Sequence, residues 1–280
     1  MDDKKATPPW AKLGALTPQE AYAWFSAKRL VHSFRWSEVW ESEHSTAFTV
    51  AGMLKEDLLA TVHGKLQVAI EEGRDAKWFE EELTPILQQA GWWGRQDIAD
   101  SDSGEVRSAQ LGSPTRLALI YDVNVRQAYA AGRWEQAQRT KATAPYMRYV
   151  TMRDERVRKS HAAWDALVLP MDDPFWDTHY PPNGYRCRCI AEPISDDGIQ
   201  DLKDAGFKVI TRRPKITYVE YEKDGQRIKV PAGIDPGFGY NAGKARGQSL
   251  ADAQTRQRAA LPKAIRDAAE KLPAKQARKP

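Results

Sequence analysis

The feature that most constrains the fold is a change in hydrophobic pattern near Pro145. Before it, apolar residues recur at the spacing of amphipathic helices. After it, short alternating segments are separated by turn sequences rich in Pro, Gly and Asp, which is typical of strands. Runs of helices followed by runs of strands favour an α+β fold over a doubly wound parallel sheet. We therefore predict a helical N-terminal half, a small turn-rich module of short antiparallel strands, and a basic C-terminal helix.

Four helices are predicted before Pro145. Thr17 and Glu20 have the spacing of a capping box and begin the first helix. Gly73 and Gly91 follow periodic stretches and end the second and third, and Ser113-Pro114 begins the fourth. GWWGRQD and SDSGE, between the third and fourth helices, predict a loop. The predicted helices span residues 17–35, 47–72, 75–89 and 113–140.

Short strands and a last helix are predicted after Pro145. Asp224-Gly225 between two alternating segments is the strongest hairpin signal in the chain. The predicted strands span residues 146–151, 167–169, 187–192, 207–210, 216–221 and 228–230, and the last helix spans residues 249–272. We divide the chain into an N-terminal arm (1–16), a helical region (17–115), a module (116–240) and a basic C-terminal helix and tail (241–280).

Charge and composition narrow the classes of function. The net charge is +4, but residues 241–280 carry ten Lys or Arg against three Asp or Glu. This predicts an acidic partner such as DNA or an acidic protein surface. The alternative is that these charges only form the solvent-exposed face of a helix. No apolar run approaches the roughly 18 residues of a membrane helix, and the N-terminus has no secretory pattern. Two cysteines exclude a disulfide framework, so we expect a reducing cytoplasm.

The segment from Thr151 to Cys189 concentrates the residues that could carry chemistry. His161, His179, Cys187 and Cys189 would make a Cys2His2 zinc set, since thiolates and neutral imidazoles are the usual zinc ligands. The Cys-x-Cys spacing is less usual than Cys-x2-Cys, and the alternative is a pair of buried thiols beside hydrogen-bonded histidines. No G-x-G-x-x-G or P-loop spacing occurs, so nucleotide binding has no support.

Other chemistry in this segment stays open. A cysteine nucleophile would use His161 or His179 as its base, with Asp165 to orient the base. Asp172, Asp173 and Asp177 would suit a magnesium-dependent enzyme, but they also form turns. The arginines suit bidentate contact with carboxylate or phosphate on a partner protein or DNA. These candidate contact residues are Arg153, Arg156, Arg158, Arg186 and Arg188.

Four large side chains stand among the turns of the same segment. Trp164, Phe175, Trp176 and Tyr180 are expected to clamp the irregular loop onto the strand that carries the cysteines. A turn-rich module needs such packing, or a metal, to hold it together.

The string YVTMRDERVRKSHAAWDALVLPMDDPFWDTHYPPNGYRCRC closely resembles the signature of the phage Mu protein F-like, or head-morphogenesis, family. AFTVAGMLKEDLL resembles the helical N-terminal half of that family, and LALIYDVNVRQAYAAGRWEQ resembles its central helix. GIDPGFGYNAG resembles the tail of the Mu-like branch. The resemblance covers residues 18–245 and is specific, because long strings match in the right order. It identifies residues 116–240 as the head-morphogenesis module.

The resemblance implies a minor head protein of a tailed phage or prophage that acts in procapsid assembly. The implied partners are the portal, scaffold or major capsid protein, with DNA reached through the basic C-terminal tail. The implied location is the virion, and the host bacterial cytoplasm during assembly. No enzymatic reaction and no membrane follow from it. The rival hypotheses are a metal-dependent hydrolase or toxin-like enzyme centred on His161 and Cys187/Cys189, and a non-specific nucleic-acid-binding module.

The family pattern also bears on the zinc site. Distant relatives carry C-x-x-C and later H-x-x-C-R-C, which resembles a zinc site. In this chain Arg158 stands at the first cysteine position and His161 at the second. Cys187 and Cys189 match, but Gly184 stands where the later motif has histidine. His179, a few residues upstream, is the candidate replacement.

Overall fold

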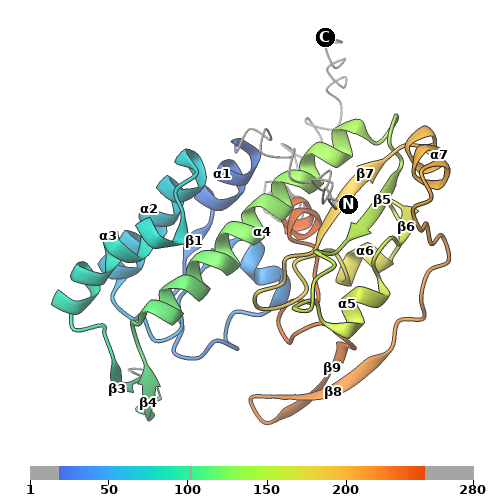
Figure 1. Ribbon diagram of the computed structural model, residues 1–280. Coiled ribbons are helices and arrows are strands. Elements are labelled where there is room, and N and C mark those ends of the chain that lie inside the picture. The colour runs from blue at the N-terminus through green and yellow to red at the C-terminus, as the bar shows by residue number, and fades with distance from the viewer. Residues whose placement is uncertain (1–18, 101–102, 250–280) are drawn as a thin grey trace, which may run out of the picture.

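The computed structural model describes residues 19–100 and 103–249. A group of helices forms one half of the molecule and a small sheet with short helices forms the other, with the long helix α4 running between them (Figure 1). This is the predicted α+β architecture. The predicted arm over residues 1–16, the capping residue Thr17 and all but the first residue of the predicted helix 249–272 lie outside the described residues.

Two of the predicted helices are confirmed, and each begins at a capping side chain. Helix α3 (Ala76–Gln89) begins where Asp75 Oδ1 accepts a hydrogen bond from Trp78 N at 2.9 Å. Helix α4 (Pro114–Thr140) begins where Ser113 Oγ accepts from Arg116 N at 3.2 Å. These side chains satisfy backbone donors that have no partner within the helix.

The first two predicted helices are shorter than expected. Helix α1 (Gln19–Ser26) ends early because strand β1 (Arg29–Leu30) pairs in parallel with β2 (Ala47–Phe48). Because β2 occupies the first residues of the second predicted helix, α2 spans only Glu56–Glu72. It ends, as predicted, at Gly73, whose φ is 69°. Between the strands lies a short 3-10 helix, η2 (Glu41–Ser45).

The loop predicted between α3 and α4 is wrong. Strands β3 (Arg95–Ala99) and β4 (Val106–Gln110) form an antiparallel hairpin there. Most of its side chains are exposed, and the apolar contacts come from Ile98 and Ala109, which pack on the helical core. The hairpin was missed because a ribbon that buries so few residues carries little of the alternation that predicts a strand.

The antiparallel sheet of the module is confirmed, with the order β6-β5-β7. Strand β5 (Tyr146–Val150) lies between β6 (Val168–Pro170) and β7 (Ile190–Ile194). Strand β7 begins after the cysteines rather than at Cys187. The strand predicted over residues 207–210 is wrong, because only one bridge joins Ile210 to Leu167.

Short helices and a second hairpin complete the module. The helices are α5 (Lys159–Ala163), α6 (Phe175–Thr178) and α7 (Asp196–Asp204). The predicted hairpin is confirmed as β8 (Tyr218–Lys223) and β9 (Gln226–Pro231), which turn at Asp224 and Gly225 with φ 49° and 79°. Residues 242–249 are helical.

Two hydrophobic clusters meet at α4. Leu117 and Ala131 belong to the cluster of the helical half, whereas Ala130 and Trp134 belong to the cluster beneath the sheet. The second cluster contains the four predicted anchors, which are all buried. These anchors are Trp164, Phe175, Trp176 and Tyr180.

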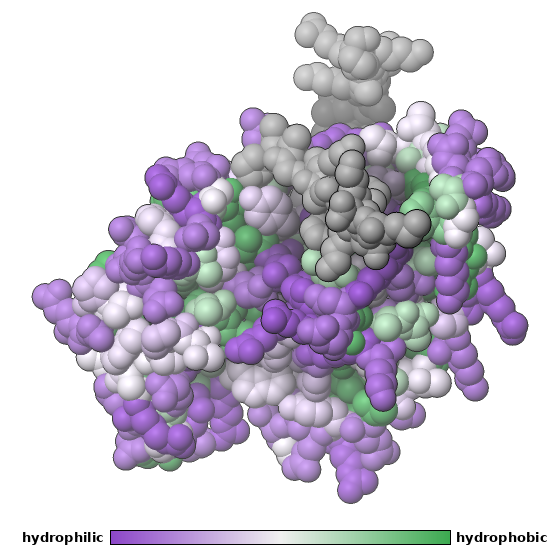
Figure 2. All heavy atoms as spheres, in the orientation of Figure 1, coloured by the Kyte–Doolittle hydropathy of each residue, from purple (hydrophilic) through white to green (hydrophobic). Residues whose placement is uncertain are grey.

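The segment 233–243 packs against both clusters and joins the two halves. Ile234 and Phe238 enter the sheet cluster, and Tyr240 and Ala242 enter the helical one. The face drawn in Figure 2 is largely hydrophilic, with small hydrophobic areas between the elements. Within the described residues, none of the helices combines the length and apolar character needed to cross a membrane.

Candidate functional site

His161, Cys187 and Cys189 come together in the module although the histidine is far from the cysteines in sequence. His161 Nδ1 lies 3.6 Å from Cys187 Sγ and 3.7 Å from Cys189 Sγ. All three side chains are buried, and their ligand atoms lie within 4.8 Å of one another. Both cysteines are free thiols. An imidazole nitrogen and two sulfurs at this spacing are a donor set that zinc accepts.

The surrounding structure orients this cluster. His161 lies on α5, and its Nε2 is 3.0 Å from the carbonyl oxygen of Gly233. A carbonyl can only accept, so Nε2 carries the proton and the lone pair of Nδ1 faces the sulfurs, as in ligating histidines. A hydrogen bond from Cys189 lowers the pKa of the Cys187 thiol, which favours a thiolate at Cys187.

His179 does not join the cluster. Its Nδ1 is 2.7 Å from Thr178 Oγ1, and its ring stacks on Phe175 with centroids 4.4 Å apart. Burial, with a smaller contribution from His161, lowers the pKa of His179 to about 4, so this imidazole is neutral near pH 7. The four-ligand set expected from the sequence is therefore not assembled, and His179 instead packs in the aromatic core.

The two departures from the family's zinc pattern are adjacent in space. Arg158 Nη2 donates to Asp235 Oδ2 at 2.9 Å and to the carbonyl oxygen of Tyr185 at 3.0 Å. A Cβ at Gly184 would collide with Asp235 and approach Arg158. The ion pair between Arg158 and Asp235 thus fills the space beside Gly184, where the family resemblance implies a ligand. Asp235 and Gly233 were not assigned a role from the sequence. They lie in GIDPGFGYNAG, which was noted only for its resemblance.

Three of the five candidate contact arginines are held by internal ion pairs. Arg153 pairs with Asp165 at 2.8 Å, Arg158 pairs with Asp235, and Arg188 makes two bonds to Asp154 at 2.7 and 2.8 Å. The other two candidates, Arg156 and Arg186, are exposed, and among the described residues neither side chain has an ion-pair partner.

A cavity of about 200 Å³ lies beside the cluster. Arg156, Arg186 and the three cluster residues line it, and its described lining contains no carboxylate. The predicted orienting residue, Asp165, instead accepts hydrogen bonds from Thr151 and Arg153. The imidazole of His161 is held by a carbonyl instead of that acid, so the triad considered for a cysteine nucleophile is not assembled.

The acidic cluster around Pro174 is dispersed. Asp172 pairs with Lys141, Asp173 with Arg213, and Asp177 with Lys244. Each carboxylate has its own cation, and within the described residues these three do not form a group suited to a metal.

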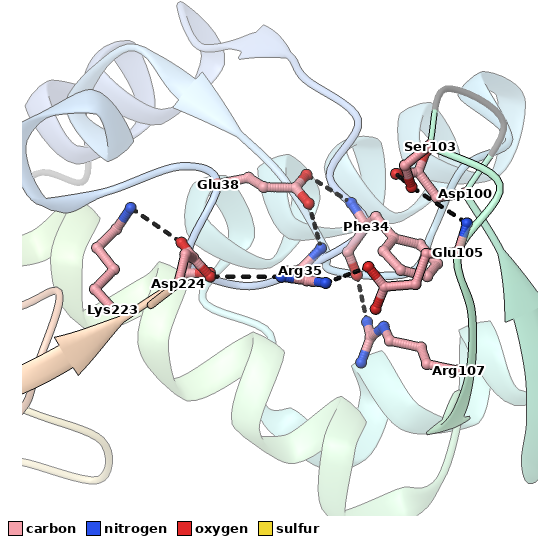
Figure 3. Close-up of polar contacts among 10 residues, drawn as sticks. Phe34, Arg35, Glu38, Asp100, Ser103, Glu105, Arg107, Lys223 and Asp224 are labelled. Carbon is pink, nitrogen blue, oxygen red and sulfur yellow. Dashed lines mark hydrogen bonds and ion pairs between the residues drawn. The ribbon is translucent and has the colours of Figure 1, made fainter. Parts of the chain in front are cut away.

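A second polar network ties the two hairpins to the loop after β1. The guanidinium of Arg35 pairs with Glu105 at the start of β4 and lies 3.9 Å from Asp224 at the turn between β8 and β9 (Figure 3). Ser37 Oγ donates to the same Asp224 at 2.8 Å. Arg107 donates to the carbonyl oxygen of Phe34 (Figure 3). The two projecting ribbons are therefore linked to the body of the protein.

The similarity to known proteins covers the part of the chain that contains this candidate site. Residues 60–192 match the family described as Phage Mu protein F like protein. The chain is 38% identical over 249 residues to a protein of Escherichia phage Mu that bears the name capsid assembly protein F, covering 82% of this chain and 55% of that protein. It is 34% identical over 229 residues to the Mu-like prophage FluMu F protein of Haemophilus influenzae, covering 76% and 53%.

The matched region includes helices α2 to α4 and the cluster of His161, Cys187 and Cys189. The chain therefore belongs to the phage Mu protein F-like family, as the resemblance in the sequence indicated. It spans about half the length of these two relatives. No solved structure matches it.

Proposed function

We propose that this protein is a non-enzymatic minor component of a phage or prophage head that acts in capsid assembly. The observation that carries the proposal is the similarity over 82% of the chain to the phage Mu protein named for capsid assembly. The proposed place of action is the procapsid in the host bacterial cytoplasm, and afterwards the virion. The proposed partners are other head proteins, namely the portal, the scaffold or the major capsid protein.

The surface proposed to meet a partner centres on Arg156 and Arg186. Both are exposed and free of ion pairs among the described residues, and both line the cavity beside the cysteines. Guanidinium groups bind carboxylates in a bidentate way and are enriched at the energetic centres of interfaces. The paired residues Arg153, Arg158 and Arg188 are proposed to hold the loops that present these two.

The same cavity is a poor setting for catalysis. A hydrolase of the kind considered from the sequence would need a general base beside the cluster. The described lining contains no carboxylate, and the nearby Asp154 and Asp235 are paired with Arg188 and Arg158. These arrangements support a structural role.

Zinc is proposed as a structural staple held by His161, Cys187 and Cys189. The fit rests on the buried sulfurs and on the free lone pair of His161 Nδ1. When bound, the metal would cross-link α5 to the segment before β7. Three protein donors are one short of a closed structural site, so the fourth position would open onto the adjacent cavity.

Genetic complementation tests the assembly role. The gene is deleted from its phage or prophage and supplied as wild type, as Arg156→Ala/Arg186→Ala, or as the control Arg212→Ala, another exposed arginine. Heads are then counted by electron microscopy. We expect the deletion and the double variant to give empty or malformed heads while the control restores filled ones. Normal infectious particles from the deletion would refute the assembly role, and normal heads from the double variant would refute the arginine surface.

DNA contact through the basic C-terminal tail is a second proposal, supported by the ten cations against three acids over residues 241–280. Binding to double-stranded DNA should be independent of sequence, weaken steeply with salt and disappear when residues 250–280 are removed. Equal binding by the truncated protein would show that the tail is not the contact.

A further inference from the structure

A second cavity, of about 190 Å³, lies away from the cysteine cluster. Its walls come from the helical half, from α4 and from residues 236–240, where the two halves of the molecule meet. Pockets at such junctions are common places for ligands. Two polar side chains in its lining are each more than nine-tenths buried and make no hydrogen bond or ion pair with any described residue, which sets it apart from an ordinary packing gap.

The first is Lys28, just after α1. Its side chain is 8% exposed, and it lines the cavity. The ammonium lies 4.0 Å from the ring centroid of Trp24 and 5.5 Å from that of Phe25. Among the described residues it has no hydrogen-bond acceptor and no ion pair. Cation–π contacts offset part of the cost of burial, but an ammonium has three donors and a buried charge normally has a carboxylate or carbonyl partner.

The second is Gln127 on α4. It is 7% exposed, lines the same cavity and makes no hydrogen bond through its side chain to any described residue. An amide can donate two hydrogen bonds. The ammonium and the amide line one cavity and carry donors that no described residue accepts, so an acceptor bound in the cavity would satisfy both groups.

The charged groups of the described lining are all cationic. Arg116 joins Lys28 there, and the described lining contains no Asp or Glu. Burial lowers the pKa of His44, which also lines the cavity, to about 4, so this imidazole is neutral near pH 7. Arg116 is engaged by the carbonyl oxygens of Gln110 and Ala51, so its charge is retained without a counterion. An anion is therefore the ligand whose charge complements the cavity.

The remaining lining restricts the kind of anion. Apolar and aromatic side chains make up most of the walls, and six of them are valine, leucine, isoleucine or phenylalanine. Such walls favour an apolar body with one negative charge over a phosphate dianion, which would be costly to desolvate beside a single free ammonium. These six residues are Val39, Val50, Leu119, Ile120, Val123 and Phe238.

We propose that this cavity is a binding site for a carboxylate attached to a small apolar group, held by Lys28 and Gln127. The carboxylate would come either from a free acid or from the end of a protein segment. The site does not depend on the assembly role, since it is formed by this chain alone.

The test compares ligands that differ in charge and little else. N-acetyl-leucine, its neutral analogue N-acetyl-leucinamide and inorganic phosphate are titrated into the full-length protein and followed by NMR. Lys28→Met removes the ammonium at nearly constant volume, and Gln127→Leu removes only the amide. Lys208→Met, at an exposed lysine, is the matched control.

We expect N-acetyl-leucine to bind with a dissociation constant of about 1 mM or tighter, and the amide and phosphate at least tenfold more weakly. Lys28→Met should abolish the preference for the acid, Gln127→Leu should weaken binding severalfold, and Lys208→Met should change nothing. Equal binding of acid and amide, no binding of the acid, or an unchanged preference in Lys28→Met would overturn the proposal. Gln127→Leu gives an independent readout if Lys28→Met does not fold.

The source of the carboxylate is resolved by a longer probe, N-acetyl-Ala-Ala-Leu with a free C-terminus. Binding as tight as that of N-acetyl-leucine supports the end of a protein segment. Binding of the short acid alone supports a free small acid.

Discussion

Replacing Lys28 by methionine should stabilise the protein, and the gain should depend on pH. Burial, together with the positive charge of Arg246, lowers the pKa of the Lys28 ammonium to about 7 from an ordinary value of 10.5. Among the described residues, Lys28 has no ion-pair partner, and its charge helps burial to lower the pKa of His44. At ~1.36 kcal/mol per pH unit, the difference corresponds to about 5 kcal/mol of unfavourable charge burial.

The direction of the pH dependence follows from proton binding. Between about pH 7 and 10.5 the unfolded chain holds the Lys28 proton and the folded chain has lost it, so the free energy of unfolding rises with pH across this window. Methionine fills similar volume without a charge, and replacing a buried charge by an apolar side chain is often stabilising. The advantage of Lys28→Met should therefore be greatest at pH 7 and shrink as the pH rises.

Urea unfolding of the wild type, Lys28→Met and the control Lys208→Met measures this. From pH 7 to about pH 9.5 we expect the difference between wild type and Lys28→Met to shrink by about 3 kcal/mol. Other titrating groups cancel in that difference, and Lys208→Met should follow the wild type. The inference that Lys28 is a buried charge would be refuted if the difference in free energy of unfolding stayed constant over this range. It would also be refuted if Lys28→Met were less stable than the wild type at pH 7.

Three further outcomes are expected. Protein purified without a histidine tag should contain one zinc per chain, and Cys187→Ser/Cys189→Ser should lose both the metal and several degrees of melting temperature; a metal-free, equally stable wild type would contradict the staple. Trp176→Ala should cost about 3–5 kcal/mol in urea unfolding, because a fully buried indole leaves a cavity. Arg35→Ala should cost under ~1 kcal/mol but speed amide exchange at the Asp224 turn, since exposed ion pairs add little stability; unchanged exchange would show that the hairpin turn is held without Arg35.

Local signals in the sequence predicted the elements whose ends depend on neighbouring residues. Ser113 begins α4 as expected, because a capping side chain bonds to a backbone group three positions away. Asp224-Gly225 makes the predicted hairpin turn, because positive φ is required there. Elements stabilised by distant contacts were missed: β1 exists only through its pairing with β2.

The candidate metal site was predicted only in part, because it too depends on contacts between residues far apart in the chain. The sequence selected the two cysteines and the histidine that the structure brings together, since their residue types and the family resemblance pointed to them. It could not exclude His179, which directly follows α6 and whose ring packs in the aromatic core. Nor could it assign Gly233, which bonds His161 across 72 positions in the chain.

The sequence by itself determined the α+β class, the family and the donor types available to a metal, because these follow from periodicity, composition and ordered strings of residues. Only the tertiary structure decided which arginines are free and which donors meet. It also placed Lys28, just after α1, and Gln127, on α4, in the lining of one cavity whose described residues include no carboxylate. Such pairings are set by packing between segments far apart in the chain. The sequence pattern does not show which residues of two distant segments will meet.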